Sequence, residues 1–96
     1  MTRSYRLRKE AWEDLVTSTN WYEERSMVAA TGLLKEFEAS LSTILQYPNG
    51  FVELGKGLRQ CAFKRFPFVV VYAMQGPSCH LVAVFHTSRN PDDKLK

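Results

Sequence analysis

The sequence lacks the features that would place a protein in a membrane or outside the cell. Its 96 residues contain no apolar run near the ~20 residues that a membrane-spanning helix needs. The start, MTRSYRLRKE, has no apolar core of the kind found in signal peptides. Only two cysteines are present, Cys61 and Cys79, and they have no metal-like spacing with the two histidines. We therefore expect a cytoplasmic protein with reduced cysteines, no metal site, no cofactor and no membrane partner.

Carboxylates are missing from one long stretch of the chain. Between Lys56 and Arg89 there are five basic residues and no Asp or Glu, whereas residues 10–55 hold eight acids and two bases. The net charge of +3 therefore hides a strongly dipolar molecule. An anionic partner, either a phosphate backbone or an acidic protein segment, is expected to be attracted to the basic stretch. The residues expected to bind the target are Lys56, Arg59, Lys64, Arg65 and Arg89.

Length and composition bound the fold. A chain of 96 residues predicts a single domain over residues 1–96, large enough to bury a core without a metal or a disulfide. A hydrophobic share of 45% with 24% charged residues is typical of soluble globular proteins.

The most apolar part of the chain predicts a central β-strand. From Phe68 to Met74 apolar residues occupy both alternating sets, so both faces of an extended chain are covered. Pro67 lacks an N–H and marks the start of that strand. The turn-forming sequence Gln75-Gly76-Pro77-Ser78 then leads to a second strand at 81–85, which predicts an antiparallel hairpin. Residues 58–66 are a third candidate strand with imperfect alternation.

The first half of the chain is predicted to be mainly helical. Residues 4–8 alternate as a short strand, residues 9 to about 25 have the periodicity of an amphipathic helix, and Ser26 can cap a second helix that ends before Tyr47. We expect residues 49–56 to be the most mobile internal loop. The order predicts an α+β domain: a short N-terminal strand, an antiparallel helical hairpin and a three-stranded antiparallel meander, with the helices on one face of the sheet.

Several of these segments together resemble a known family. The segments, in chain order, are AWEDL (11–15), WYE (21–23), FE (37–38) and Pro48, then Arg59, RFPF (65–68) and Tyr72, and finally AVFH (83–86) and RNP (89–91). This ordered set is similar to the RelE/ParE superfamily of bacterial toxins, and the match spans nearly the whole chain. The resemblance implies a toxin of a type II toxin-antitoxin, or plasmid stabilisation, module. It also implies a cognate antitoxin whose tail wraps the toxin, with assembly as a hetero-oligomer or a homodimer.

The resemblance leaves two activities open. Toxins like RelE cut messenger RNA on the ribosome, which requires an acid, a base and cations around the phosphate. His86, Arg65 and Arg89 are the candidate catalytic residues on that reading, because the unperturbed pKa of histidine lies near neutrality. The family's ribonucleases usually have a further tyrosine or histidine beyond this arginine, whereas here residues 90–96 contain neither and include two carboxylates.

Toxins like ParE instead bind DNA gyrase and inhibit it, which requires only a binding surface. The RFPF and HxxRNP segments resemble that branch more, so gyrase inhibition is our first hypothesis and RNA cleavage the second. A third hypothesis is a binding module without toxic activity. On the first reading His86 is a structural residue at the end of a strand.

Three aromatic residues of the first helix predict a partner surface. Trp12, Trp21 and Tyr22 are more than one face of a short helix can bury in a small core. We expect part of this set to contact the antitoxin or a second copy of the chain. The alternative is that all three pack against the second helix.

Overall fold

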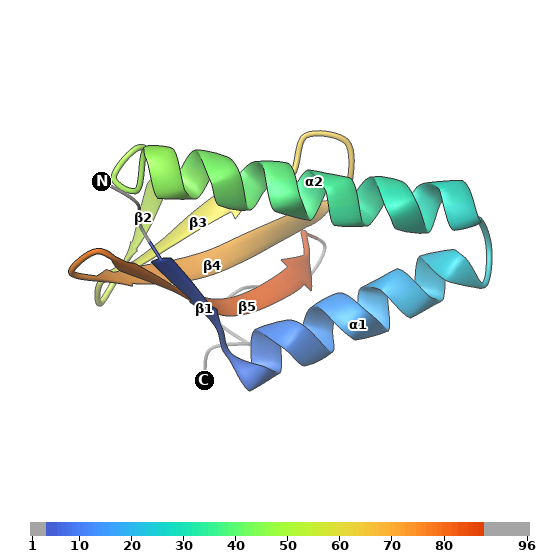
Figure 1. The fold of residues 1–96 in the computed structure, drawn as a ribbon, viewed down its shortest axis with the longest axis horizontal. Helices are drawn as coiled ribbons and strands as arrows, with labels where there is room; N and C mark the ends of the chain where they lie inside the picture. Colours follow the sequence, from blue (N-terminus) through green and yellow to red (C-terminus); the bar gives the residue numbers. More distant parts are fainter. Residues whose placement is uncertain (1–3, 88–96) are drawn as a thin grey trace.

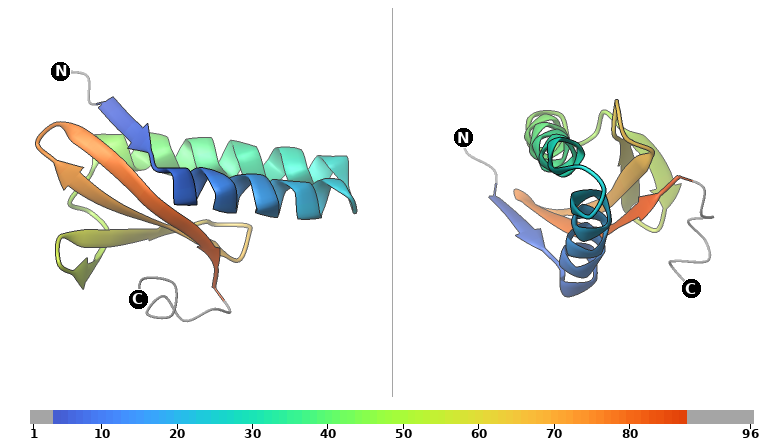
Figure 2. Two further views of the ribbon diagram at one scale, coloured as in Figure 1. Left: turned by 90° about the horizontal axis from the view of Figure 1, so that it is seen from below. Right: turned by 90° about the vertical axis from the view of Figure 1, so that its right-hand side faces the viewer.

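Two antiparallel helices lie side by side on one face of a five-stranded mixed sheet (Figures 1 and 2). The computed structural model describes residues 4–87 of the chain. The strands occur in the order β1-β5-β4-β3-β2 across the sheet. The elements are β1 (Ser4–Leu7), α1 (Lys9–Glu23), α2 (Met27–Gln46), β2 (Val52–Gly55), β3 (Leu58–Ala62), β4 (Phe68–Gln75) and β5 (Ser78–His86).

Strand β4 is the centre of the sheet, as its two-sided apolar pattern predicts. All residues from Phe68 to Tyr72 are buried. Phe68, Val70 and Tyr72 belong to the main core beneath the helices, whereas Val69 and Val71 form a second cluster with Ala83 and Phe85 of β5. Alternation along the buried residues 68–72 thus supplies apolar side chains to both faces of the sheet.

The predicted hairpin between β4 and β5 is confirmed. Gln75 pairs with Ser78, so Gly76 and Pro77 form a two-residue loop. Gly76 has a φ of 60°, a left-handed conformation that glycine adopts without a steric cost. The antiparallel ladder then continues from Met74 with Cys79 to Phe68 with His86.

The two helices lie over different strands. Helix α1 contacts β5, and α2 contacts β3. The stripe that α2 buries consists of Ala30, Leu33, Phe37, Leu41 and Ile44. Ser26 caps α2 as predicted, because its side-chain oxygen accepts a hydrogen bond from the Ala29 N–H at 3.2 Å.

The sheet differs from the expected one in four places. Strand β2 occupies part of the segment that we expected to be a mobile loop, because the turn Gly55-Lys56-Gly57 lets it fold back onto β3. Strand β3 ends at Ala62 rather than Phe66, and β5 begins at Ser78 rather than Leu81. Finally, β1 pairs with β5 in parallel, so that the sheet is mixed. The overall class, helices on one face of a sheet containing the β3-β4-β5 antiparallel meander, is confirmed.

Neither of the helices described over residues 4–87 is long and apolar enough to cross a membrane.

Candidate functional site

The basic residues expected to bind a target do not gather in one place. Lys56 lies in the turn between β2 and β3, whereas Lys64 and Arg65 lie in the loop after β3. The five residues of β3 separate the two groups by at least about 13 Å, at roughly 3.3 Å per residue. Arg89 lies outside the residues that the structure describes.

Arg59 makes contacts within the chain. Its guanidinium donates a hydrogen bond to the Phe51 carbonyl oxygen at 2.8 Å and lies 3.8 Å from the Glu53 carboxylate. Only 27% of its side chain is exposed. These contacts fasten β3 to β2 and to the residue that precedes β2, so Arg59 has a structural role whatever else it does.

The loop of residues 63–67 is held firmly at its base. The Phe63 N–H donates to the Phe68 carbonyl oxygen at 2.9 Å, and the Arg65 N–H donates to the Glu36 carboxylate of α2. The Phe66 ring packs against α2 at Gly32, where an added Cβ would lie 3.2 Å from the ring. The backbone of the loop is thereby fixed while the Lys64 and Arg65 side chains remain exposed.

His86 lies at the same end of the sheet as this loop. It is the last residue of β5 and pairs with Phe68, whose ring meets the imidazole edge-on at a centroid distance of 5.3 Å. The next residue, Thr87, donates its N–H to the Pro67 carbonyl oxygen at 2.8 Å. The structure therefore places Lys64, Arg65 and His86 at one end of the sheet and leaves Lys56 and Arg59 apart from them.

A cavity of about 540 Å³ opens beside His86, between α1 and the strands β4 and β5. Six α1 residues line it: Glu13, Asp14, Thr17, Ser18, Trp21 and Tyr22. Four strand residues complete it: Phe68, Val84, Phe85 and His86. The walls therefore combine aromatic rings with two carboxylates and the hydroxyl groups of Thr17, Ser18 and Tyr22, and none of the lining residues within 4–87 is Lys or Arg.

Sequence reasoning missed the polar half of this cavity. Asp14 uses one carboxylate oxygen to accept a hydrogen bond from the Val84 N–H at 3.2 Å, which fastens α1 to β5. Asp14, Thr17 and Ser18 are three and four residues apart, so they lie on one side of the helix. That spacing is visible in the sequence, but nothing in it indicates that β5 lies opposite.

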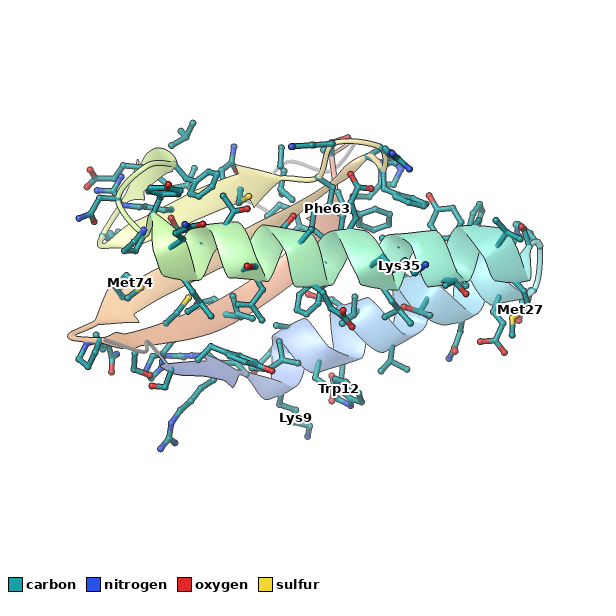
Figure 3. The ribbon with its side chains drawn as sticks, turned by 45° about the horizontal axis from the view of Figure 1, so that its top comes forward. Lys9, Trp12, Met27, Lys35, Phe63 and Met74 are labelled. Atoms are coloured by element: carbon teal, nitrogen blue, oxygen red, sulfur yellow. The ribbon has the colours of Figure 1, made fainter. Side chains whose placement is uncertain are left out.

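The three aromatic residues expected to contact a partner lie in two places. Trp12 is 55% exposed and Trp21 51% exposed, while Tyr22 is partly buried against the core. Nine residues, about two and a half turns, place Trp12 and Trp21 on opposite sides of α1. Figure 3 shows Lys9 and Trp12 projecting from the first turns of α1 at the margin of the molecule. Only Trp21 and Tyr22 line the cavity.

Tyr72 and the two cysteines, Cys61 and Cys79, are buried in the core. The Tyr72 hydroxyl donates to the Pro48 carbonyl oxygen at 2.7 Å, and burial raises the pKa of Tyr72 to about 12. Burial likewise raises the pKa of Cys79 to about 11 and raises the pKa of Cys61. These groups therefore stay neutral near pH 7, which suits packing rather than proton transfer or nucleophilic attack.

Solved structures share this arrangement of helices and sheet. No protein family model and no curated protein matches the chain. Its fold is that of RelE/ParE toxins, as the sequence resemblance implies. One is a chain from the chromosomal ParDE TA system from P. aeruginosa, with a TM-score of 0.76 and 17% sequence identity. The match covers 88% of this chain and 96% of that chain. Another is the isolated E. coli RelE toxin, with a TM-score of 0.60 and 11% sequence identity. That match covers 97% of this chain and 93% of the RelE chain.

Proposed function

We propose that this protein is the toxin of a type II toxin-antitoxin module of the plasmid stabilisation kind, and that it acts in the cytoplasm by binding and inhibiting DNA gyrase, as ParE-like toxins do. The shared fold and the higher TM-score against the ParDE structure support the toxin class and the branch. One observation of the site favours gyrase over RNA as the target. His86 lines the same cavity as the carboxylates Glu13 and Asp14.

That observation bears on chemistry at a phosphate. His86 is the candidate acid or base that the sequence indicates, and it lies at the same end of the sheet as the exposed Lys64 and Arg65. A cleaving enzyme would therefore bring an RNA phosphate to it. Two carboxylates in the cavity would repel that phosphate, and salt does not remove a repulsion acting over less than the Debye length of about 8 Å. The mixture of acids and imidazole therefore disfavours RNA cleavage at this place.

A gyrase inhibitor needs a rigid contact surface and no proton transfer. The loop of residues 63–67 offers one, because its backbone is bonded to β4 and α2 while Lys64 and Arg65 are exposed. We propose that Lys64 and Arg65, together with Lys56 and Arg89, contact the target. The cognate antitoxin is the second partner, and the toxin assembles with it in a hetero-oligomer or forms a homodimer.

RNA cleavage on the ribosome remains the second candidate function for one specific reason. The exposed side chains of Lys64 and Arg65 lie at the same end of the sheet as His86. This places cations and a group that can exchange protons within one region, which is the minimum that cleavage requires.

Two assays on purified protein distinguish these functions. In the first, gyrase, ATP and plasmid are incubated with the protein, and supercoiling and double-strand breaks are measured on gels. In the second, translating ribosomes and messenger are incubated with it, and the messenger is examined for cuts. We expect stabilised DNA breaks and intact messenger.

Cut messenger with normal supercoiling would assign the protein to the RNA-cleaving class instead. If neither assay responds and induction of the gene does not slow growth, the protein is a binding module without toxic activity. Co-expression with the neighbouring gene, when that gene encodes a small DNA-binding protein, supplies the control, because an antitoxin restores growth.

A further inference from the structure

We propose that Glu36 of α2 is a positioning residue for target binding. It fixes the peptide group between Lys64 and Arg65, and with it the directions in which these two cationic side chains point. The inference rests on the proposed function, in which Lys64 and Arg65 contact the target, and it adds the residue that prepares them for that contact.

The two cations lie between anchored neighbours. Phe63 precedes them and is buried in the main core. Phe66 follows them, and its ring packs against Gly32 of α2 and edge-on against Tyr22 of α1, at a centroid distance of 5.3 Å. Both ends of the pair are therefore held, and the peptide group between residues 64 and 65 is the part that these anchors leave unfixed.

A hydrogen bond from the loop to α2 fixes this peptide group. The Arg65 N–H donates to the Glu36 carboxylate. Because a peptide group is planar, orienting its N–H also orients the Lys64 carbonyl and the bonds to both Cα atoms. The directions of the Lys64 and Arg65 side chains, which are both exposed, follow from the orientation of that plane.

One face of α2 supplies both contacts with the loop. Gly32 and Glu36 are four residues apart and therefore lie on the same side of the helix. At Gly32 an added Cβ would lie 3.2 Å from the Phe66 ring, so the missing side chain lets the loop come close to the helix. This close approach brings the Arg65 N–H within reach of the Glu36 side chain, so α2 determines both where the loop lies and how it is turned.

Stability alone does not account for a carboxylate at this position. The Glu36 Oε2 atom is buried and has no hydrogen-bond partner within residues 4–87. A buried oxygen without a partner lowers stability, whereas the bond to the Arg65 N–H raises it, and the two effects are of similar size. The net contribution of Glu36 to the stability of the fold is therefore small, although its bond orients the loop.

The side chains that Glu36 positions are available to a partner. None of the ion pairs in the described part of the chain includes Lys64 or Arg65. A loop that already has its binding conformation loses less conformational freedom on association, and this raises affinity without any new contact. Glu36 therefore contributes to binding although it does not touch the target.

The first test needs no target. Amide hydrogen exchange is measured by NMR on the full chain labelled with ¹⁵N, and the unmodified protein is compared with Glu36→Ala and with Glu38→Ala, which removes an exposed carboxylate of the same helix. We expect Glu36→Ala to speed exchange at Arg65 by about 10-fold or more and to leave Val70 of β4 unchanged. Glu38→Ala should change neither amide. Glu36→Gln keeps an oxygen that accepts the N–H and should preserve most of the protection.

The second test uses the gyrase assay. Glu36→Ala should raise the protein concentration that gives half of the maximal DNA breaks by about 5-fold or more, whereas Glu36→Gln and Glu38→Ala should stay near the unmodified protein. In a protein that already carries Lys64→Ala and Arg65→Ala, Glu36→Ala should have no further effect, because the side chains through which it acts are gone. All variants should melt within about 4 °C of their parent proteins.

Three results would overturn the proposal. The first is unchanged exchange at Arg65 in Glu36→Ala, and the second is equal inhibition of gyrase by Glu36→Ala and the unmodified protein. The third is an equal loss of inhibition in the background that lacks Lys64 and Arg65, which would mean that Glu36 acts on the fold as a whole.

Failure of the proposed function has a different signature. In that case the unmodified protein itself does not inhibit gyrase, a result that does not depend on any Glu36 variant. The positioning role would then fall with the function on which it rests, and protection of the Arg65 amide would describe a structural contact alone.

Discussion

The Tyr72 hydroxyl donates a hydrogen bond to the Pro48 carbonyl oxygen at 2.7 Å and so joins the centre of β4 to the segment that follows α2. The ring of Tyr72 is completely buried, and Phe51 meets it edge-on at 6.3 Å. One residue of the central strand thus fixes where α2 ends and where the chain turns towards β2.

Replacing Tyr72 by Phe should lower the free energy of unfolding by about 0.5 to 1.5 kcal/mol. The substitution keeps the ring and removes only the hydroxyl, so the loss is that of one hydrogen bond. Urea unfolding followed by circular dichroism measures the difference. A variant as stable as the unmodified protein would mean that the hydroxyl contributes nothing to stability.

The difference in stability between the unmodified protein and Tyr72→Phe should depend on pH. Burial raises the pKa of Tyr72 to about 12, from the usual value of 10.0 for a tyrosine exposed to water. Between these two pKa values the unfolded state loses the proton while the folded state retains it, so stability falls as pH rises. The free energy of unfolding of the unmodified protein should therefore fall relative to that of Tyr72→Phe by about 1.4 kcal/mol per pH unit from pH 10 to about pH 12. Because this fall exceeds the advantage near neutral pH, Tyr72→Phe should become the more stable of the two within this range.

Below pH 10 the advantage should be constant, since both states are protonated there. The measurement is a series of urea unfolding curves for both proteins at each pH. Taking the difference removes the contributions of Cys61, Cys79 and the lysines, which both proteins share. A difference that stays flat up to pH 12 would contradict the raised pKa.

Arg59→Ala should destabilise the protein by roughly 1 to 3 kcal/mol, because it removes the bond from the guanidinium to the Phe51 carbonyl oxygen. Lys56→Ala in the adjacent turn serves as the control, since Lys56 is exposed and its loss should leave stability nearly unchanged. Thermal unfolding measures both. If Arg59→Ala instead abolishes gyrase inhibition while the melting temperature stays constant, Arg59 is a contact residue and not a structural one.

Ser26→Ala should lower the free energy of unfolding by about 1 kcal/mol. The Ser26 side chain accepts the Ala29 N–H at the start of α2, and alanine leaves that donor without its partner. Ser42→Ala, at an exposed position within the same helix, should be neutral or slightly stabilising because alanine favours the helix. Equal stability of the two variants in urea would show that the cap is unimportant.

His86→Gln and Arg89→Ala separate the two candidate activities. Glutamine keeps hydrogen-bonding capacity but cannot exchange protons near neutral pH, so a ribonuclease using His86 would lose on the order of 10²-fold or more in rate. We expect growth arrest to survive His86→Gln and to weaken with Arg89→Ala, which removes a charge and a planar set of donors. Loss of toxicity with His86→Gln and tolerance of Arg89→Ala, both variants being folded, would favour RNA cleavage.

Local patterns of the sequence determined most of the fold. The two-sided apolar run of 68–74 required a covered central strand, Gly76 with Pro77 required a tight turn, and Ser26 marked the start of α2. Each of these follows from the conformational preferences of a few adjacent residues. The order of the elements followed from the same patterns, and the resemblance to RelE/ParE toxins added a known fold, which the solved structures share.

The candidate site, by contrast, was predicted only in part. Lys64, Arg65, His86, Trp21 and Tyr22 do lie at one end of the sheet. Lys56 lies elsewhere because strand β3 separates it from the loop of residues 63–67. Trp12 lies elsewhere because it is on the side of α1 opposite Trp21, which lines the cavity.

Tertiary structure alone decided the parallel pairing of β1 with β5, the addition of β2 at the edge, and the meeting of Asp14 with Val84. Asp14 and Val84 are 70 residues apart in the chain. Periodicity in a sequence indicates that a residue is buried, because burial depends on which face of its helix or strand the residue occupies. It does not report which distant segment covers it, because that depends on how whole elements pack together, and the acidic cavity beside His86 is a product of that packing.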